Sequence, residues 1–189
     1  MAIKLGFALC GSFCTFAKAI PQIEELKNSG IDVTPIMSYN AYETDTRFGT
    51  AKEHIERIES ICSKKIIHTL TQAEPIGPKK LIDALLIEPC TGNTIAKIAL
   101  GIADTPVTLA AKSNLRNGNP VIIAISTNDA LGNAAKNIGL LMNSKNIFFV
   151  PFNQDDCINK QNSIVADFTK TKDTVFNAIV GKQLQPMII

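Results

Sequence analysis

Short apolar runs alternate along the chain with longer stretches in which apolar residues recur every three or four positions. Short continuous runs are typical of buried strands, and the longer spacing is typical of amphipathic helices. The strands that this pattern predicts are residues 3–9, 31–37, 85–87, 121–125 and 147–150, with shorter candidates at 66–70 and 164–166. The helices that it predicts lie between Ser12 and Gly30 and over residues 51–62, 94–104, 107–115, 130–143 and 172–180, with a helical turn at 79–84.

Proline and polar residues interrupt this pattern. Pro21 lies inside the first predicted helix and is expected to kink it or split it in two, because proline lacks the N–H of a helical hydrogen bond. Residues 39–50 and 151–162 are polar and irregular and are predicted to be loops. On the helices at 94–104 and 172–180, Ile102 and Phe176 are expected to face the core.

Strands that alternate with helices indicate a parallel sheet with helices on both of its faces. No internal repeat, low-complexity tract or linker divides the chain. The sequence therefore predicts an α/β fold, a three-layer Rossmann-like parallel sheet, in one domain over residues 1–189.

Composition narrows the classes of function. The chain has 189 residues, of which 46% are hydrophobic and 19% charged, and its formal net charge is +2 at pH 7. No apolar run reaches the roughly 18 residues that a membrane span needs, and no basic stripe with aromatic neighbours indicates nucleic-acid binding. The N-terminus lacks a signal-peptide pattern. We expect a cytoplasmic protein that binds neither membrane nor nucleic acid.

The five cysteines are odd in number and scattered, which favours reduced thiols over a disulfide framework. Cys10 and Cys14 are not followed by a second pair, and the chain has two histidines. No metal site is predicted.

Candidate chemistry lies where the predicted strands end. Gly11 allows a tight turn after the first strand, and Ser12 can cap the following helix, whose free N–H groups suit a phosphate. Ser38, residues 89–94 and residues 126–128 follow three other predicted strands. The carboxyl ends of parallel strands meet at one edge of the sheet, where ligands bind. Each hydroxyl here has helix capping as its alternative role.

Residues 88–97, 101–108 and 124–132 resemble the branch formed by the B subunits of the dipicolinate synthases. This branch is part of the flavoprotein family, which includes the homo-oligomeric flavin-containing cysteine decarboxylases. The resemblance runs over essentially the whole chain. It implies FMN as cofactor and a homo-oligomeric assembly.

The same resemblance implies an oxidoreductase subunit that acts during sporulation. The reaction is the oxidation of a dihydro- or hydroxytetrahydro-dipicolinate, a small dicarboxylate, to dipicolinate. Activity would require an A subunit that resembles nicotinamide-dependent dehydrogenases. NAD(P) would then enter only through this partner subunit.

Site residues are carried over from the matching motifs. The family holds the FMN phosphate at the positions of the first turn and of Ser38, lays the segment at 89–94 along the flavin, and uses the segment at 126–128 on the substrate side. The cofactor-binding residues that this implies are Gly11, Ser12, Phe13, Ser38, Pro89, Cys90, Thr91, Gly92, Asn93, Thr94 and Ser126. The catalytic candidates are Asn128, from the substrate-side segment, and His54, because the decarboxylases use a histidine from a comparable early helix.

The chain also departs from the family. Residues 90–92 read Cys-Thr-Gly in place of Ala-Ser-Ala, and the Pro and Met of the family's Pro-x-Met-Asn segment are missing before Asn128. No counterpart of the decarboxylases' Cys-containing flap is found, and residues 155–157 occupy that region. Two alternatives therefore stay open: a non-catalytic nucleotide-binding or scaffolding subunit, and an FMN-dependent decarboxylase.

Overall fold

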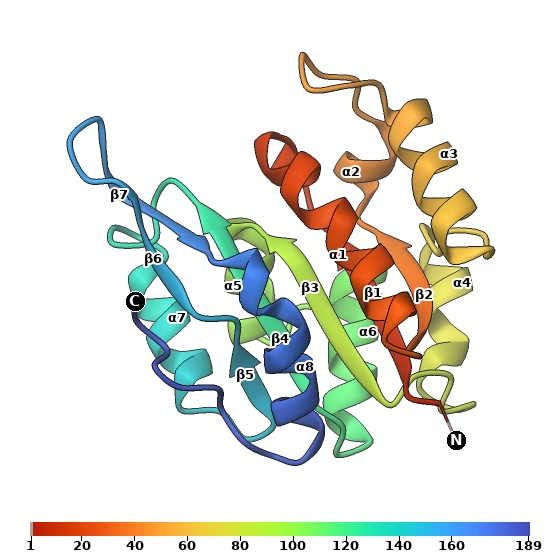
Figure 1. Ribbon diagram of the computed structural model, residues 1–189. Coiled ribbons are helices and arrows are strands. Elements are labelled where there is room, and N and C mark those ends of the chain that lie inside the picture. Colours follow the sequence, from red (N-terminus) through yellow and green to blue (C-terminus); the bar gives the residue numbers. More distant parts are fainter. Residues whose placement is uncertain (1) are drawn as a thin grey trace.

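A seven-stranded sheet forms the middle layer of the computed structural model, which describes residues 2–189 (Figure 1). The strand order is β2-β1-β3-β4-β7-β6, and β5 pairs with β4. The strands are β1 (Lys4–Leu9), β2 (Asp32–Met37), β3 (Ala84–Cys90), β4 (Val121–Thr127), β5 (Ile147–Phe149), β6 (Phe152–Asp156) and β7 (Lys160–Ala166).

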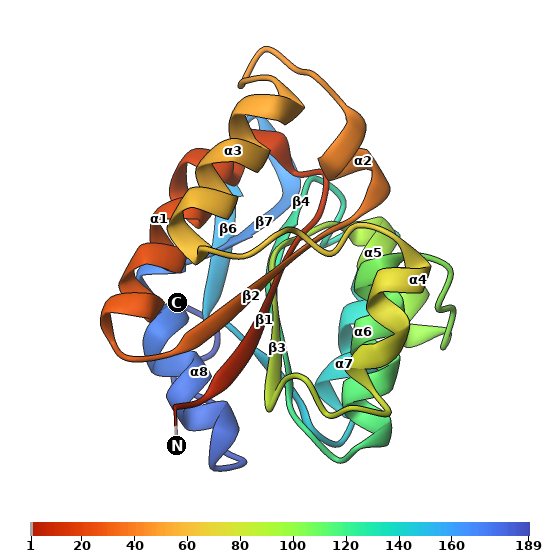
Figure 2. The ribbon, with the colours of Figure 1, turned by 90° about the vertical axis from the view of Figure 1, so that its right-hand side faces the viewer.

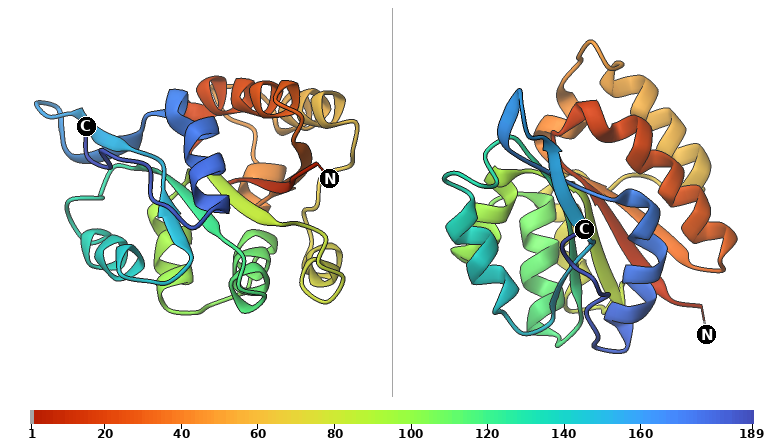
Figure 3. Two further views of the ribbon diagram at one scale, coloured as in Figure 1. Left: turned by 60° about the horizontal axis from the view of Figure 1, so that its bottom comes forward. Right: turned by 60° about the vertical axis from the view of Figure 1, so that its left-hand side comes forward.

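Helices cover both faces of the sheet (Figures 2 and 3). One face carries α1 (Phe16–Asn28), α3 (Ala51–Cys62) and α8 (Thr171–Ile179). The other carries α4 (Leu70–Ala73), α5 (Gly92–Ala99), α6 (Pro106–Arg116) and α7 (Ala135–Met142). A short α2 (Tyr39–Glu43) follows β2, and 3-10 turns lie at η1 (Phe13–Thr15), η2 (Glu74–Ile76) and η3 (Phe168–Lys170). The predicted three-layer α/β fold is confirmed.

The central strands are buried on both faces, as their continuous apolar runs predict. Every residue of β3 is buried, and in β1 only Lys4 is exposed. Large side chains such as Phe7, Phe16 and Phe149 lie wholly inside. Burial of each is worth about 1.5–3 kcal/mol, so the two helix layers and the sheet hold one another in place.

The sheet is mixed rather than wholly parallel, which corrects the prediction. Strands β1 to β5 pair in parallel, whereas β7 pairs antiparallel with both β4 and β6. Residues 151–162, predicted to be a loop, contain β6 and the start of β7. The sequence does not reveal this hairpin because most of its outer residues are exposed and polar, so apolar alternation is weak there.

Two turns in the first half of the chain also differ from expectation. Residues 39–50 contain α2, whose N-terminus Ser38 caps. The helical turn predicted at 79–84 is absent; helical residues precede Gly77 instead, because Thr69 and Gln72 form a capping box that starts α4. Lys80 has a φ of 47°, which does not fit a helix. Residues 66–70 supply a single bridge, Ile67 to Ile36, in place of a strand.

Three helices differ from the predicted elements in continuity, in length or in the face that is buried. Helix α1 is one continuous element across Pro21; Ala17, whose carbonyl loses its bond to the proline, is exposed, so water can satisfy it. Helix α5 stops at Ala99, ahead of Gly101 with its φ of 71°, which leaves Ile102 exposed. Phe176 is exposed on α8.

Helix α7 starts at Ala135, later than the predicted 130, because the backbone carbonyl of Asp129 bonds the N–H groups of Gly132 and Ala134 in a turn. Within residues 2–189, no helix combines the length and apolar character that crossing a membrane requires.

Candidate functional site

The strand order reverses next to β1, and the candidate site lies at the carboxyl edge of the sheet there. The chain leaves β1 for β2 on one side, and returns to β3 and then β4 on the other. Such a switch point opens a crevice between the loops that follow the strands. The segments after β1, β2, β3 and β4 meet here, as the sequence predicted.

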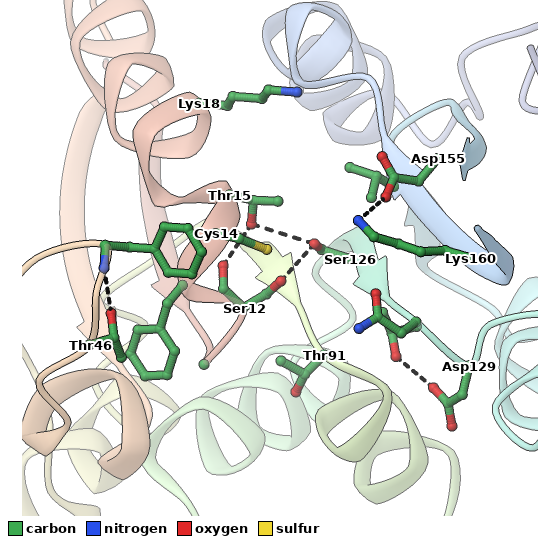
Figure 4. Close-up of a pocket in the computed structure, with 16 residues that line it drawn as sticks. Ser12, Cys14, Thr15, Lys18, Thr46, Thr91, Ser126, Asp129, Asp155 and Lys160 are labelled. Atoms are coloured by element: carbon green, nitrogen blue, oxygen red, sulfur yellow. Dashed lines mark hydrogen bonds and ion pairs between the residues drawn. The ribbon is translucent and has the colours of Figure 1, made fainter. Parts of the chain in front are cut away.

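The larger of two neighbouring cavities at this edge has a volume of about 560 Å³ (Figure 4). We call it the β4-side cavity. The predicted site residues that line it are Gly11, Ser12, Phe13, Thr91, Ser126 and Asn128. Lysines and acids that the sequence analysis did not select also line it: Lys18, Asp129, Asp155 and Lys160.

The smaller cavity, of about 360 Å³, lies toward β2, and we call it the β2-side cavity. It shares Gly11 and Thr91 with the β4-side cavity, so the two cavities adjoin along the sheet edge. The other predicted residues that line it are Ser38, Asn93 and Thr94. Cys10, Lys97, Asp104 and Thr105 complete its polar wall.

Ser12 ties the β1 turn to the end of β4. Its hydroxyl makes no capping bond, contrary to expectation, and lies 2.8 Å from the hydroxyl of Ser126 (Figure 4). Thr15 donates to the Ser12 carbonyl at 2.8 Å and lies 3.4 Å from the Ser126 hydroxyl. This chain of hydroxyls joins residues more than 100 positions apart and fixes the floor of the β4-side cavity.

Ser38 and Thr91 each cap a helix and also line a cavity of the site. The Ser38 hydroxyl accepts from the Ala41 N–H, and the Thr91 hydroxyl accepts from the Thr94 N–H. Capping holds each hydroxyl at the start of a helix, where N–H groups favour an anion. Thr105 does the same at the start of α6.

Pro89 and Cys90 lie beneath the site rather than in its wall. Both are buried at the end of β3, and neither lines a cavity of the site. Burial raises the pKa of the Cys90 thiol well above its usual value. A hydrogen bond from Cys90 lowers the pKa of the neighbouring Cys10 thiol, to which Thr94 also donates at 3.3 Å. Cys90 is thus held as a neutral thiol at pH 7.

His54 is set back from both cavities. Its ring packs edge-on against Phe16, with 5.0 Å between centroids. A Cβ at Gly49 would come within 2.8 Å of its Nε2 atom, so the loop before α3 closes over the ring. Burial lowers the pKa of His54. The structure therefore keeps this candidate catalytic residue apart from Asn128, which lines the β4-side cavity.

Asp155 and Lys160 come from the β6–β7 hairpin (Figure 1) and line the β4-side cavity (Figure 4). Their side chains form an ion pair at 3.0 Å. Sequence reasoning missed both because the polar residues of the hairpin predict a loop. It missed Lys18 because the pattern of α1 marks only the apolar face of that helix.

Gly92, at the start of α5, packs closely against the side chains of Asp129 and Thr127. A Cβ there would lie 2.8 Å from the Asp129 Oδ1 atom and 2.9 Å from the Thr127 hydroxyl. Thr127 donates to that same carboxylate at 2.6 Å. Gly92 therefore contributes space rather than a side chain.

Comparisons with known proteins agree with the resemblance found in the sequence. The flavoprotein family profile matches residues 2–183. The B subunit of dipicolinate synthase from Bacillus subtilis (strain 168) is 45% identical over 186 residues, which cover 98% of this chain and 93% of that protein.

Solved structures extend the comparison. The crystal structure of the dipicolinate synthase B subunit from Bacillus halodurans C has a TM-score of 0.91 and 43% identity, covering 100% of this chain and 98% of that one. The FMN-dependent cysteine decarboxylase SpaF has a TM-score of 0.66 and 21% identity, covering 94% of this chain and 95% of that one. SpaF shares the fold.

Proposed function

The chain belongs to the flavoprotein family, and from this premise we propose that it is the FMN-binding B-type subunit of a dipicolinate synthase. The observation that carries the proposal is the pair of adjoining cavities at the switch point. The β2-side cavity has hydroxyls and helix starts suited to a phosphate, and the β4-side cavity has lysines suited to a small dicarboxylate. The 45% identity to the Bacillus subtilis protein supports the same role.

The donor set of the β2-side cavity fits the phosphate of FMN. It brings together the capping hydroxyls of Ser38, Thr91 and Thr105 and the starts of α5 and α6. Helix N-termini and hydroxyls are the usual protein ligands of a phosphate. Within residues 2–189, the Ser38 hydroxyl only accepts a bond, from Ala41, so its hydrogen is available to a ligand.

The flavin ring would then extend past Gly11 and Thr91, the two residues that both cavities share. Bound FMN supplies a two-electron acceptor. The chain's own residues fix the surroundings: Ser12, Thr15 and Ser126 hold the floor, and the β6–β7 hairpin shields the cavity from one side.

The β4-side cavity suits a ligand with two carboxylates. Lys18 from α1 and Lys160 from β7 both line it. A hydrogen bond between an ammonium and a carboxylate is worth about 1.5–3 kcal/mol. Two such groups favour a dicarboxylate over a monocarboxylate of the same size.

The direct test of the proposal is an equilibrium titration of the purified chain with FMN, followed by flavin fluorescence and visible absorption. We expect saturable binding with one FMN per chain. Riboflavin, which lacks the phosphate, should bind at least tenfold more weakly if the β2-side cavity holds that group.

The titration also separates the proposal from its main alternative. A scaffolding subunit would form an active complex with its partner in the absence of flavin, and would not bind FMN. Missing Pro and Met residues before Asn128 favour this alternative. Turnover by a flavin-free complex would therefore contradict the FMN proposal.

Replacing Lys160 with glutamine is expected to raise the KM for the dicarboxylate substrate about tenfold, in the complex with the partner subunit, because one charge-assisted contact is lost. The unpaired Asp155 would also repel the substrate. Lys112→Gln, on the exposed side of α6, is the matched control and should leave KM unchanged. An unaltered KM in Lys160→Gln would rule out this contact.

We further propose that the chain assembles with copies of itself and with an A subunit that resembles nicotinamide-dependent dehydrogenases, which would supply NAD(P). The resemblance to the homo-oligomeric flavin-containing cysteine decarboxylases supports an oligomeric assembly. The resemblance implies that the substrate is oxidised during sporulation, and we propose the cytoplasm as the location on the sequence pattern of the chain.

A further inference from the structure

A carboxylate that the family resemblance does not assign lies in the wall of the β4-side cavity. Asp129 follows β4 and lines the cavity together with Thr127 and Asn128 (Figure 4). The Thr127 hydroxyl donates to Asp129 Oδ1 at 2.6 Å, which fixes the carboxylate's position. The turn that follows holds the backbone as well, since the Asp129 carbonyl accepts from Gly132 at 2.9 Å and from Ala134 at 3.2 Å.

Gly92 lies directly against the Thr127–Asp129 pair. A Cβ there would approach Asp129 Oδ1 and the Thr127 hydroxyl to less than 3.0 Å, a distance that carbon and oxygen atoms do not reach without displacement. Gly92 stands where the resembling family has alanine. Thr127 lies within the segment at 126–128 that departs from the family's Pro-x-Met-Asn, and Asp129 follows that segment. The two segments that differ from the family are therefore in contact, and the glycine leaves room for the Thr127–Asp129 pair.

Charge pairing distinguishes Asp129 from the other carboxylate of the cavity. Asp155 is neutralised by Lys160 at 3.0 Å. Among residues 2–189, Asp129 has a hydroxyl rather than a cation as its side-chain partner. The carboxylate available to a ligand in this cavity is therefore that of Asp129.

We propose that Asp129 accepts the proton released when a dihydropyridine-type dicarboxylate is oxidised in the β4-side cavity. This inference rests on the proposed function. One ring C–H bond breaks with its electron pair passing to a two-electron acceptor of the flavin or nicotinamide class. The hydrogen on the adjacent ring atom leaves as a proton to an Asp129 carboxylate oxygen, and its bonding pair enters the aromatic ring. Asp129 then returns the proton to water.

Lys18, and Lys160 through the N–H donors that its pair with Asp155 leaves free, would hold the two substrate carboxylates. Thr127 would orient the accepting carboxylate of Asp129. A positioned general base contributes about 10²–10⁴-fold to rate. Substitution of Asp129 is therefore expected to lower kcat by at least a factor of about 100.

The experiment compares Asp129→Asn and Asp129→Glu with the wild type, each as the complete complex with the partner subunit. Asp129→Asn should lose kcat by about 100-fold while its KM stays no higher than that of the wild type, because a base contributes to the chemical step and a negative charge does not help to bind a dicarboxylate. Asp129→Glu should recover part of the lost kcat. Because Asp129 is exposed, both variants should fold, and both should bind FMN within about twofold of the wild type.

Gly92→Ala provides a second, independent variant. Its methyl group would displace the Thr127–Asp129 pair, so kcat should fall although the Asp129 carboxylate is still present. Asp129→Asn with kcat within threefold of the wild type overturns the inference alone. Normal turnover by a wild-type complex without FMN overturns the cofactor proposal. The inference about Asp129 is then still decided by the kcat of Asp129→Asn in that flavin-free complex. A wild-type complex without turnover on any such dicarboxylate overturns both.

Discussion

Replacing Glu88 with glutamine is expected to remove most of the loss of stability that the protein suffers between pH 5 and pH 8. Glu88 lies at the end of β3 with none of its surface exposed. Its Oε2 atom accepts from the Thr171 hydroxyl at 2.6 Å, and Oε1 has no partner among residues 2–189. Burial raises the pKa of this carboxyl from 4.5 to about 8, so the folded protein holds it neutral at pH 7.

The direction of the effect follows from where the proton is held. Below the unfolded-state pKa of 4.5, Glu88 is protonated in both the folded and the unfolded state, so it does not make the free energy of unfolding depend on pH. Above it, the unfolded chain loses the proton while the folded chain keeps it, so the free energy of unfolding falls by up to about 1.4 kcal/mol per pH unit. The fall ends near the folded-state pKa of about 8, at a total of roughly 5 kcal/mol.

Denaturant unfolding at pH 5, 6.5 and 8 measures this dependence. Glu88→Gln keeps an oxygen for Thr171 and cannot ionise, so its advantage over the wild type should grow steadily with pH. Glu56→Gln, on the exposed face of α3, is the matched control and should stay within about 0.5 kcal/mol of the wild type at every pH. Parallel curves for Glu88→Gln and the wild type would show that Glu88 ionises normally when folded.

The strands and the first turn of the site could be predicted because their signals are local. Residues 3–9 form a continuous apolar run, and β1 is buried accordingly. Gly11, Ser38 and Thr91 are residue types that favour turns or helix caps at the ends of strands, and each lines at least one of the two cavities. Because the strands of an α/β sheet have their carboxyl ends at one edge, the fold class alone predicted that these three residues lie near one another.

The rest of the site depends on pairings between distant residues. The Ser12–Ser126 hydrogen bond joins positions 114 apart, so the cap predicted for Ser12 gives way to a contact that no local pattern encodes. The β6–β7 hairpin carries Asp155 and Lys160, yet its exposed residues show no apolar alternation. The family resemblance implies a flavin contact at Gly92. In the structure this glycine leaves room for the side chain of Asp129, which is 37 positions away and which no local pattern places beside it.

Introducing a negative charge at Ser38 is expected to abolish FMN binding while leaving the fold intact. Ser38 caps α2 and lines the β2-side cavity, where the phosphate would lie. Aspartate and asparagine cap helices about equally well, so Ser38→Asp and Ser38→Asn should be similarly stable. A carboxylate about 4 Å from a phosphate charge costs about 4 kcal/mol per unit charge near a protein surface. The dissociation constant for FMN should therefore rise by at least about 100-fold in Ser38→Asp.

Fluorescence titration with FMN gives the two dissociation constants, and thermal unfolding without ligand checks that both variants fold. Ser38→Asn keeps a hydrogen-bond donor and no charge, so its FMN affinity should stay within about tenfold of the wild type. Riboflavin adds an internal control: because it carries no phosphate, its weaker binding should be the same in both variants. If Ser38→Asp and Ser38→Asn bound FMN equally, the phosphate would lie away from Ser38, and the β4-side cavity with Lys18 and Lys160 would become the anion site.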